Sequence, residues 1–529
     1  MQNNGNLASI PGDGGKRWLL SLARLCGVAL VWVFAESLVV LAQVSDESLA
    51  DADQRFRQGQ FSEAASAYRK VLTDNPKQVS AYVGLARTLL KQDNAVEAER
   101  VCAKGFDVAP DSPSLRAVLG DVYFRQARFD EAKTAFVRAL RGDSNLARAY
   151  LGLGRVLATE SNYKSAKQNF IKAHELDPKD PEVLRWWAST LKRPERVQAL
   201  TEYLGLATNE DPDVVESIKS SLELLKAIGD KKTWILQGPP RAGSVKLTVS
   251  RPVPQIINGL LLGVSFNGGK PVKLLLDTGA SGILIHPNVA KRFGLRPLAT
   301  TQVTGVGDEG KRAAHFAWAD SIKIGDLEFR ECIVDVSERK IVADRDGLVG
   351  PDLFARFRIA LSYRRQTMDL SPLPPLPREA QEDEQNRFDH DRIIPPEMRD
   401  FTPIGKVGTH LLIETRVNDK VDCYFLIDTG STENLISNLV AKEVTDLRKG
   451  GRGVTGLSGR VKDVYEAYRL VLQFAHFRQE NIGLPAFDLR PLSKRMGTEV
   501  SGILGHSILQ YFTLTLNYRD GLVDFAYEE

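Results

Sequence analysis

Small and aromatic residues recur every 34 positions through the first third of the chain. Four columns carry this period: Ala52, Ala86, Gly120 and Gly154; Ala64, Ala98, Ala132 and Ala166; Tyr68, Cys102, Phe136 and Phe170; Pro76, Pro110, Ser144 and Pro178. Such a period is typical of a helix-turn-helix unit in which small residues allow close packing, an aromatic fills the gap and proline ends the second helix. The pattern predicts four helical pairs over 45–180 and further or capping helices over 181–230.

From Val245 onward the pattern changes to short runs of Val, Ile, Leu and Phe. Turn signals such as Asn267-Gly268-Gly269 and Asp520-Gly521 separate these runs, which predicts antiparallel β-structure. Two β units, 245–370 and 401–529, flank a proline-rich and charged segment, 371–400. This segment is predicted as a semi-rigid spacer, with a docking ligand for another domain as the alternative.

The two β units have matching sequences. Leu274–Ile285 aligns with Phe425–Ile436 at an offset of 428 − 277 = 151, and Gly347–Gly350 aligns with Gly502–Gly505 at an offset of 502 − 347 = 155. The difference, 155 − 151 = 4 residues, is one loop insertion. The C-terminal half is therefore a duplicated unit about the size of a small domain.

Charge and cysteine content exclude several classes of function. The net charge of the 529 residues is +3, and no basic tract with interleaved aromatics occurs, so nucleic-acid binding is not expected. Cys26 lies in an N-terminal apolar segment, and Cys102, Cys332 and Cys423 are widely spaced. This spacing fits neither a disulfide framework nor a zinc site, and we expect no metal and no cofactor.

The N-terminal segment, 1–42, has the pattern of an export signal. Lys16, Arg17 and Arg24 precede an apolar stretch, and Val40-Leu41-Ala42 suits cleavage before Gln43. The alternative is a retained membrane anchor, although Glu36 is costly at the middle of a membrane. Both interpretations place the functional part outside the cytosol, in the periplasm or the extracellular space.

Each β unit carries the triplet Asp-Thr-Gly at the same position, as Asp277-Thr278-Gly279 and Asp428-Thr429-Gly430. Two carboxylates at hydrogen-bonding distance share one proton, because like charges that close cannot both ionise. Such a pair can deprotonate a water on one side of a carbonyl and protonate the carbonyl oxygen on the other. We therefore predict that Asp277 and Asp428 form one catalytic dyad, to which each unit contributes one carboxyl group.

Each β unit resembles a retropepsin-type aspartic protease subunit. The apolar strand entering each triplet and the later apolar-apolar-Gly elements, ending in Gly350 and Gly505, carry the resemblance. It implies that Thr278 and Thr429 brace the two loops, that Gly279 and Gly430 allow close approach, and that a flap hairpin lies between the two motifs. The flap candidates are Gly305-Val306-Gly307 in the first unit and Gly456-Leu457-Ser458-Gly459 in the second.

The residue after each triplet differs between the units: Ala280 in the first and Ser431 in the second. The Ser431 hydroxyl can stabilise the charged form of the neighbouring carboxyl group, whereas Ala280 cannot. Asp277 is therefore predicted to be the more readily protonated member of the pair.

The helical part resembles the tetratricopeptide repeat, with Cys102 and Ser144 departing from the aromatic and proline positions. Stacked repeats form an extended concave surface, so the resemblance implies a protein or peptide partner. A spacer or an oligomerisation element without a peptide ligand is the alternative.

Other chemistries lack their residues. Gly305–Gly310 matches a dinucleotide fingerprint, but an extended segment follows it where a helix is required. Asp389-His390-Asp391 lies in the charged segment and is predicted to be a solvated loop rather than a metal site. Neither His-Glu-x-x-His nor Gly-x-Ser-x-Gly occurs in the sequence.

The prediction from sequence is an exported protein with an all-α tetratricopeptide-repeat solenoid followed by an all-β, two-lobed aspartic endopeptidase. The repeats are expected to recruit or orient protein substrates. One alternative is a non-catalytic adaptor that binds peptides. The other is a protease whose lobes pair with those of a second chain.

Overall fold

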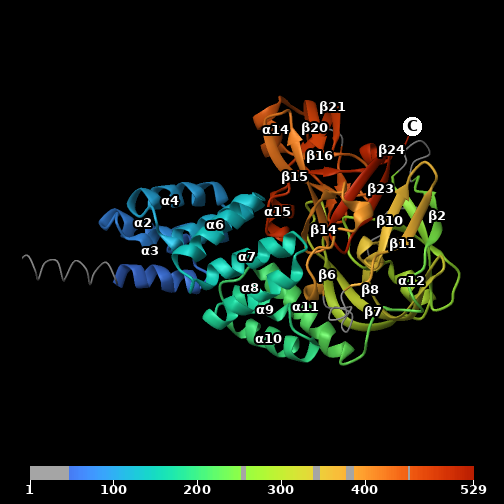
Figure 1. Cartoon of the computed structure of the whole chain (residues 1–529), viewed down its shortest axis with the longest axis horizontal. Helices are drawn as coiled ribbons and strands as arrows, with labels where there is room; N and C mark the ends of the chain where they lie inside the picture. The colour runs from blue at the N-terminus through green and yellow to red at the C-terminus, as the bar shows by residue number, and fades with distance from the viewer. Residues whose placement is uncertain (1–46, 252–257, 338–345, 377–386, 451–452, 529) are drawn as a thin grey trace, which may run out of the picture.

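The computed structural model describes residues 47–251, 258–337, 346–376, 387–450 and 453–528. The segment predicted as a signal or anchor, 1–42, lies outside the described residues. Within the described ranges, every helix is too short or too polar to cross a membrane. Helices form one part of the molecule and strands the other, which confirms the predicted fold class (Figure 1).

The helical part is a stack of helix pairs, called the array below. Residues 47–57 are helical and precede α2. The later helices are α2 (Phe61–Asp74), α3 (Val79–Lys91), α4 (Ala95–Val108), α5 (Pro113–Arg125), α6 (Phe129–Gly142), α7 (Ala147–Thr159), α8 (Tyr163–Leu176), α9 (Pro181–Ala188), α10 (Arg193–Leu206) and α11 (Pro212–Ile228).

The 34-residue columns form contacts between paired helices. Phe136 and Phe170 are completely buried. A Cβ atom on Gly120 would lie 2.6 Å from the Phe136 ring, and one on Gly154 would lie 2.6 Å from the Phe170 ring. Protein interiors are close-packed, so the small residue of one helix makes room for the aromatic residue of the next.

Two β lobes follow the array. Lobe 1 contains β2 (Gly243–Val249), β3 (Leu260–Phe266), β4 (Val272–Leu276), β5 (Ile283–Ile285), α12 (Pro287–Arg292), β6 (Arg296–Val303), β7 (Arg312–Ile324), β8 (Leu327–Ser337) and β9 (Gly347–Val349). Lobe 2 contains β13 (Gly405–Val407), β14 (His410–Val417), β15 (Val421–Ile427), β16 (Leu435–Ser437), α14 (Asn438–Val444), β17 (Leu447–Lys449), β18 (Thr455–Gly456), β19 (Gly459–Arg460), β20 (Tyr465–Phe474), β21 (Phe477–Phe487), α15 (Arg490–Met496), β22 (Gly502–Leu504) and α16 (His506–Leu509).

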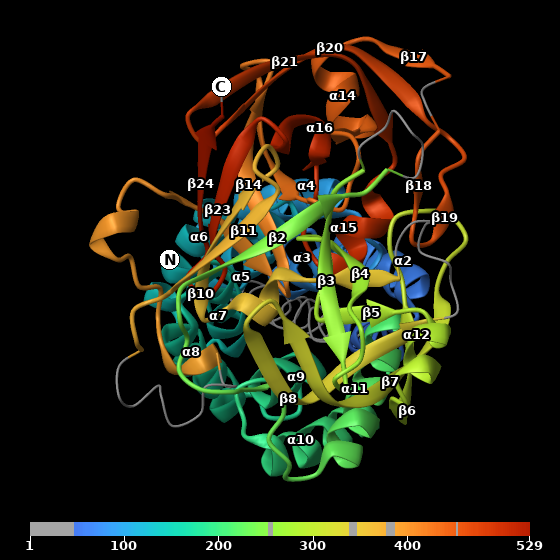
Figure 2. The same ribbon diagram turned by 90° about the vertical axis from the view of Figure 1, so that its right-hand side faces the viewer.

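A shared sheet joins the two lobes within one chain (Figure 2). Its strands run in the order β12 (Thr402–Pro403), β24 (Leu522–Tyr527), β23 (Phe512–Asn517), β10 (Phe357–Ser362), β11 (Thr367–Pro372) and β2. At its centre β10 pairs antiparallel with β23, with Leu361 opposite Leu514. The two lobes therefore lie on either side of an internal pseudo-twofold axis.

The array packs directly on lobe 2. The rings of Phe129 and Tyr424 make an edge-to-face contact at 5.0 Å between centroids. The Thr498 hydroxyl donates to the Phe124 carbonyl at 2.7 Å, and the next backbone amide, that of Glu499, donates to the Arg125 carbonyl at 2.9 Å. Apolar contact and backbone hydrogen bonds therefore fix the array to the protease-like half.

The charged segment between the lobes also contacts the array. Asp391 accepts hydrogen bonds from the backbone amide of Ser165 at 2.9 Å and from its hydroxyl at 2.8 Å, in the first turn of α8. His390 is 6% exposed, and Phe388, 2% exposed, packs on Tyr163. The predicted solvated loop at 389–391 is therefore wrong, because an acidic cap and an aromatic ring attach it to the array. Residues 377–386 of the segment lie outside the described residues.

Candidate active site

The two Asp-Thr-Gly triplets begin where equivalent central strands end. Leu276 ends β4 and lies opposite Val349 of the parallel strand β9, while Ile427 ends β15 and lies opposite Leu504 of β22. The backbone amide of Asp277 donates to the Val349 carbonyl at 2.9 Å. The apolar-apolar-Gly elements thus lie directly beside the strands that deliver the aspartates.

The two threonines bind the loops to each other across the pseudo-twofold axis. The Thr278 hydroxyl donates to the Ile427 carbonyl at 2.7 Å, and the Thr429 hydroxyl donates to the Leu276 carbonyl at 2.8 Å. Each threonine amide donates to the other hydroxyl at 3.0 Å. Both side chains are buried, so these four hydrogen bonds are shielded from water and hold the loops in one arrangement.

The two aspartate carboxyl groups are in contact, because Asp428 shares a side-chain hydrogen bond with Asp277. The glycines of the triplets make this approach sterically possible. A Cβ atom on Gly430 would lie 2.4 Å from Asp277 Cγ, and one on Gly279 would lie 2.9 Å from Asp428 Cγ. A larger residue at either position would push the two carboxyl groups apart.

Burial raises the pKa of Asp428, while the hydrogen bond with Asp277 and two backbone amides oppose that rise. These amides belong to Gly430 and Ser431 and lie 2.9 Å and 3.1 Å from Asp428 Oδ1. Burial and the charges of Asp428 and Asp277 together raise the pKa of Tyr363, which is itself a buried residue. Both aspartates are half-buried, and two carboxyl groups in hydrogen-bond contact hold one proton between them.

The contact predicted between the Ser431 hydroxyl and the aspartate is not present in the structure. The Ser431 hydroxyl donates to the Glu433 carbonyl at 2.9 Å, so the predicted contact with the aspartate is not made by the hydroxyl. The backbone amide of Ser431 makes it instead, and stabilises the charged form of Asp428.

The two flap candidates meet over the lobes. The Ser458 amide donates to the Val306 carbonyl at 2.9 Å, and the Glu309 amide donates to the Ser458 carbonyl at 2.7 Å. A Cβ atom on Gly307 would lie 2.4 Å from the Gly459 carbonyl oxygen. The loops 304–311, called flap 1, and 455–460, called flap 2, are thus hydrogen-bonded to each other.

Each flap tip also packs its apolar side chain on the opposite lobe. Leu457 of flap 2 contacts an apolar wall of lobe 1 formed by Leu261, Leu275, Leu284 and Leu348. Val306 of flap 1 packs on a larger apolar cluster on the lobe 2 side, which includes the equivalent residues Leu412, Leu426, Leu435 and Ile503. The two tip residues are themselves equivalent, since 457 − 306 = 151. The closed flaps thus occupy both walls.

A second pair of carboxyl groups lies in lobe 1. Asp352 accepts two hydrogen bonds from the Gly282 amide, at 2.9 and 3.0 Å. Burial, together with the charge of Asp352, raises the pKa of Asp335 to about 7. Because its pKa is higher in the folded state, Asp335 contributes to stability in its protonated form. This contribution is complete below about pH 4 and is lost as the pH rises through about 7.

Asp335→Asn is expected to remove this pH dependence. The variant should match the wild type in free energy of unfolding at pH 4 and exceed it by about 2 kcal/mol at pH 8. Urea unfolding at both pH values measures the difference, with Asp326→Asn in the exposed β7–β8 turn as the matched control. An equal difference between variant and wild type at the two pH values would contradict the assignment.

Two residues that contact the first triplet and flap 1 were not predicted from the sequence. His410 is half-buried, and its ring hydrogen-bonds to the backbone of Gly279. Desolvation lowers the pKa of His410, and this bond opposes that change. Arg495 of α15 donates to the Gly305 carbonyl of flap 1 at 3.1 Å. At the offset of 151, His410 in the second unit corresponds to Gly259 in the first, and this difference between the units could have pointed to His410. Nothing in the sequence links Arg495 to a flap.

No cluster of three or more His, Cys, Asp or Glu side chains suited to a metal ion occurs in the part of the chain that the structure describes. The site therefore consists of two carboxyl groups, their backbone donors and two flaps. This arrangement can hold a proton and a water beside a bound carbonyl group.

Comparison with known families gives three matches. Residues 262–353 match the family of aspartyl proteases, and residues 55–122 and 118–181 match two tetratricopeptide-repeat families. The chain thus joins tetratricopeptide repeats to an aspartyl protease domain, which confirms the resemblance predicted from sequence. A comparison with curated proteins gave no match.

Solved structures similar to this chain include repeat proteins. PilF of Pseudomonas aeruginosa is 19% identical, over 34% of this chain and 84% of that protein, with a TM-score of 0.26. A thermophilic tetratricopeptide-repeat protein of Thermus thermophilus is 21% identical, over 34% of this chain and 98% of that protein, with a TM-score of 0.28. MamA is 23% identical, over 29% and 93%, with a TM-score of 0.22.

Proposed function

We propose that this chain is an aspartic endopeptidase in which Asp277 and Asp428 activate one water molecule to hydrolyse a peptide bond. The observation that carries the proposal is the hydrogen bond between the two carboxyl groups, at the ends of equivalent strands. The braced loops support it, because a general acid and a general base must be held in fixed geometry to act together.

In the proposed reaction the charged carboxyl group takes a proton from water while the protonated one donates its proton to the carbonyl oxygen. The hydroxide adds to the carbonyl carbon and gives a geminal diol. As the C–N bond breaks, the amine leaves with the proton that was taken from water, and a diol hydroxyl returns its proton to the other carboxyl group, so the product is a carboxylic acid and the pair again holds one proton. Asp428 accepts two backbone amides on one oxygen, and Asp277 accepts that of Gly279 at 2.8 Å; we take Asp428 as the charged member. Asp277 is therefore proposed as the proton donor in the first step.

A substrate has to displace the flap tips before it can reach the carboxyl groups. Val306 and Leu457 then leave the two apolar walls exposed. Apolar side chains on either side of the cleaved bond would re-cover these walls, at about 25 cal/mol per Å² of apolar surface. An unfolded segment with apolar residues is therefore the proposed substrate class.

The array is proposed to bind a protein partner or substrate, as repeats of this family generally do. The proposed place of action is outside the cytosol, on the basis of the basic and apolar pattern of the first 42 residues.

The test uses the full chain and an unfolded protein substrate between pH 3 and pH 8. New peptide termini, identified by mass spectrometry, should appear with the wild type and not with the Asp277→Asn/Asp428→Asn double variant. The rate should pass through a maximum with pH, because one carboxyl group must be charged and the other protonated. A wild type that is inert at every pH would support the adaptor alternative instead.

A further inference from the structure

The connection between α10 and α11 and the first turn of α11 contact three separate parts of the molecule through three acidic side chains. Glu210 pairs with Lys91 of the array at 2.6 Å. Asp211 pairs with Lys494 of α15 in lobe 2 at 2.9 Å, and Asp213 pairs with Lys311 of flap 1 in lobe 1 at 2.6 Å. We call residues 207–213 the acidic junction.

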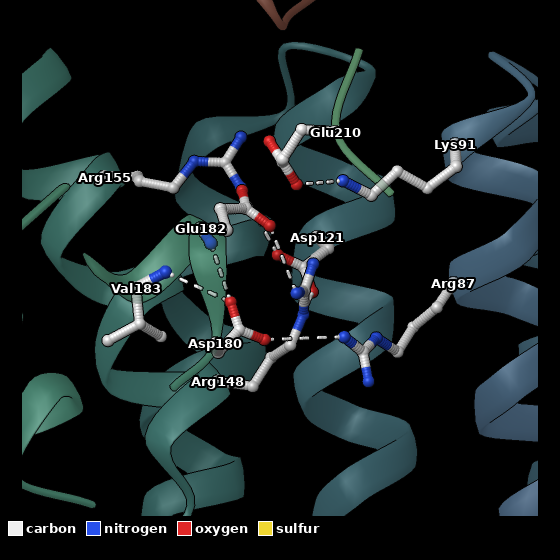
Figure 3. A network of polar contacts seen from close by, with 9 residues as sticks. All are labelled: Arg87, Lys91, Asp121, Arg148, Arg155, Asp180, Glu182, Val183 and Glu210. Atoms are coloured by element: carbon white, nitrogen blue, oxygen red, sulfur yellow. Dashed lines mark hydrogen bonds and ion pairs between the residues drawn. The ribbon is translucent and has the colours of Figure 1, made fainter. Parts of the chain in front are cut away.

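On the array side, the Lys91–Glu210 pair lies beside a network of ion pairs between helices (Figure 3). Arg148 pairs with Asp121 at 2.6 Å and with Glu182 at 3.2 Å, and Arg155 pairs with Glu182 at 3.2 Å. Asp121 and Glu182, which belong to the array, therefore neutralise these two arginines. The charge of Lys91 acts on Glu182 of this network, and the carboxylate that Lys91 binds comes from the acidic junction.

A second contact ties the acidic junction to the first helix of the array. The Thr208 hydroxyl donates to the Arg57 carbonyl at 2.9 Å. The Glu210 side chain is 6% exposed, so its ion pair with Lys91 is shielded from solvent. The position of the acidic junction therefore depends on how the beginning and the end of the array are placed relative to each other.

On the protease side, the acidic junction holds flap 1 at both ends. Lys494, held by Asp211, precedes Arg495, which donates to the Gly305 carbonyl at the flap tip. The charge of Asp213 also acts on Arg495, and the same carboxylate pairs with Lys311 at the base of the flap. Flap 1 in turn carries the hydrogen bonds that keep flap 2 closed.

We propose that the acidic junction is a latch through which the array controls the opening of the flaps. With Glu210 on Lys91, the acidic junction holds α15 and flap 1 in the closed arrangement. An acidic segment of a partner protein that takes Lys91 from Glu210 moves the acidic junction and releases flap 1. The effect of flap opening on cleavage rests on the proposed peptidase activity, whereas the latch itself can be tested without catalysis.

The test is hydrogen exchange of the full-length protein, read by mass spectrometry at flap 1 and flap 2. Glu210→Gln and Lys91→Met break the pair from either side, and Asp213→Asn acts on the protease side while leaving the array pairs unchanged. Glu216→Gln on α11, whose carboxylate pairs with Lys219 at 3.9 Å on an exposed face, is the matched control.

Glu210→Gln, Lys91→Met and Asp213→Asn should each accelerate flap exchange by about fivefold or more, because the Gly305, Glu309 and Ser458 amides lose protection when the flaps part. Glu216→Gln should not. Faster exchange at 207–213 with unchanged flap exchange in Glu210→Gln and Lys91→Met would overturn the latch. If one of these two variants fails to fold, the other decides the array side. Peptide cleavage is measured separately, so a latch without activity would refute only the proposed function.

Discussion

Asparagine in place of either Asp277 or Asp428 is expected to lower kcat/KM for peptide cleavage by at least about 1,000-fold. Asparagine has nearly the same shape but cannot take or release the proton that the pair shares. Because the two carboxyl groups act as one unit, the double variant should be no less active than either single variant. Steady-state kinetics of the three variants against one peptide measures this.

Mixing the two single variants separates an internal dyad from a dyad formed between two chains. The hydrogen bonds between Thr278 and Thr429 and the pairing of β10 with β23 join the lobes within one chain. The mixture should therefore stay as inactive as its components. Recovered activity in the mixture would show that lobes of different chains pair, as the alternative from sequence holds.

Thr278→Val is expected to lower the free energy of unfolding by about 2–4 kcal/mol. Valine keeps the shape of threonine but removes a hydroxyl that donates to the Ile427 carbonyl and accepts from the Thr429 amide. Both groups would then stay buried without their partner, and the full desolvation cost would remain. Denaturant unfolding measures the change, and the peptidase assay should show a parallel loss.

Thr367→Val is the matched control for this prediction. The Thr367 hydroxyl oxygen is buried and has no hydrogen-bond partner among the described residues. Its removal should be neutral or slightly stabilising, because a buried polar atom without a partner is unfavourable. The bracing role of Thr278 is refuted if the two variants unfold at the same denaturant concentration.

The array and the duplicated lobes could be predicted because each follows a repeat in the sequence. The 34-residue columns place Gly120 against Phe136 and Gly154 against Phe170, the same contact in two successive helix pairs. The offset of 151 relates Asp277 to Asp428 and also relates the flap tips. A repeat makes the packing positions recognisable in the sequence, because the same contact requires the same type of residue in each copy.

The contacts that connect the parts could not be predicted, because they join segments without a common period. Arg495 and Gly305 are 190 residues apart, and Ser165 and Asp391 are 226 residues apart. The direction of the Ser431 hydroxyl likewise depends on the local path of the loop to Glu433, which residue type alone does not set. Single contacts of this kind leave no pattern in one sequence.

The crossing of the flap tips has a consequence for how the two halves of the protein can diverge. Leu457 fits a wall made by the first half, and Val306 fits a wall made by the second. A substitution at either tip is therefore compensated in the other half of the chain, not in its own. At the two flap tips, each half of the duplicated chain therefore limits which side chains the other half can accept.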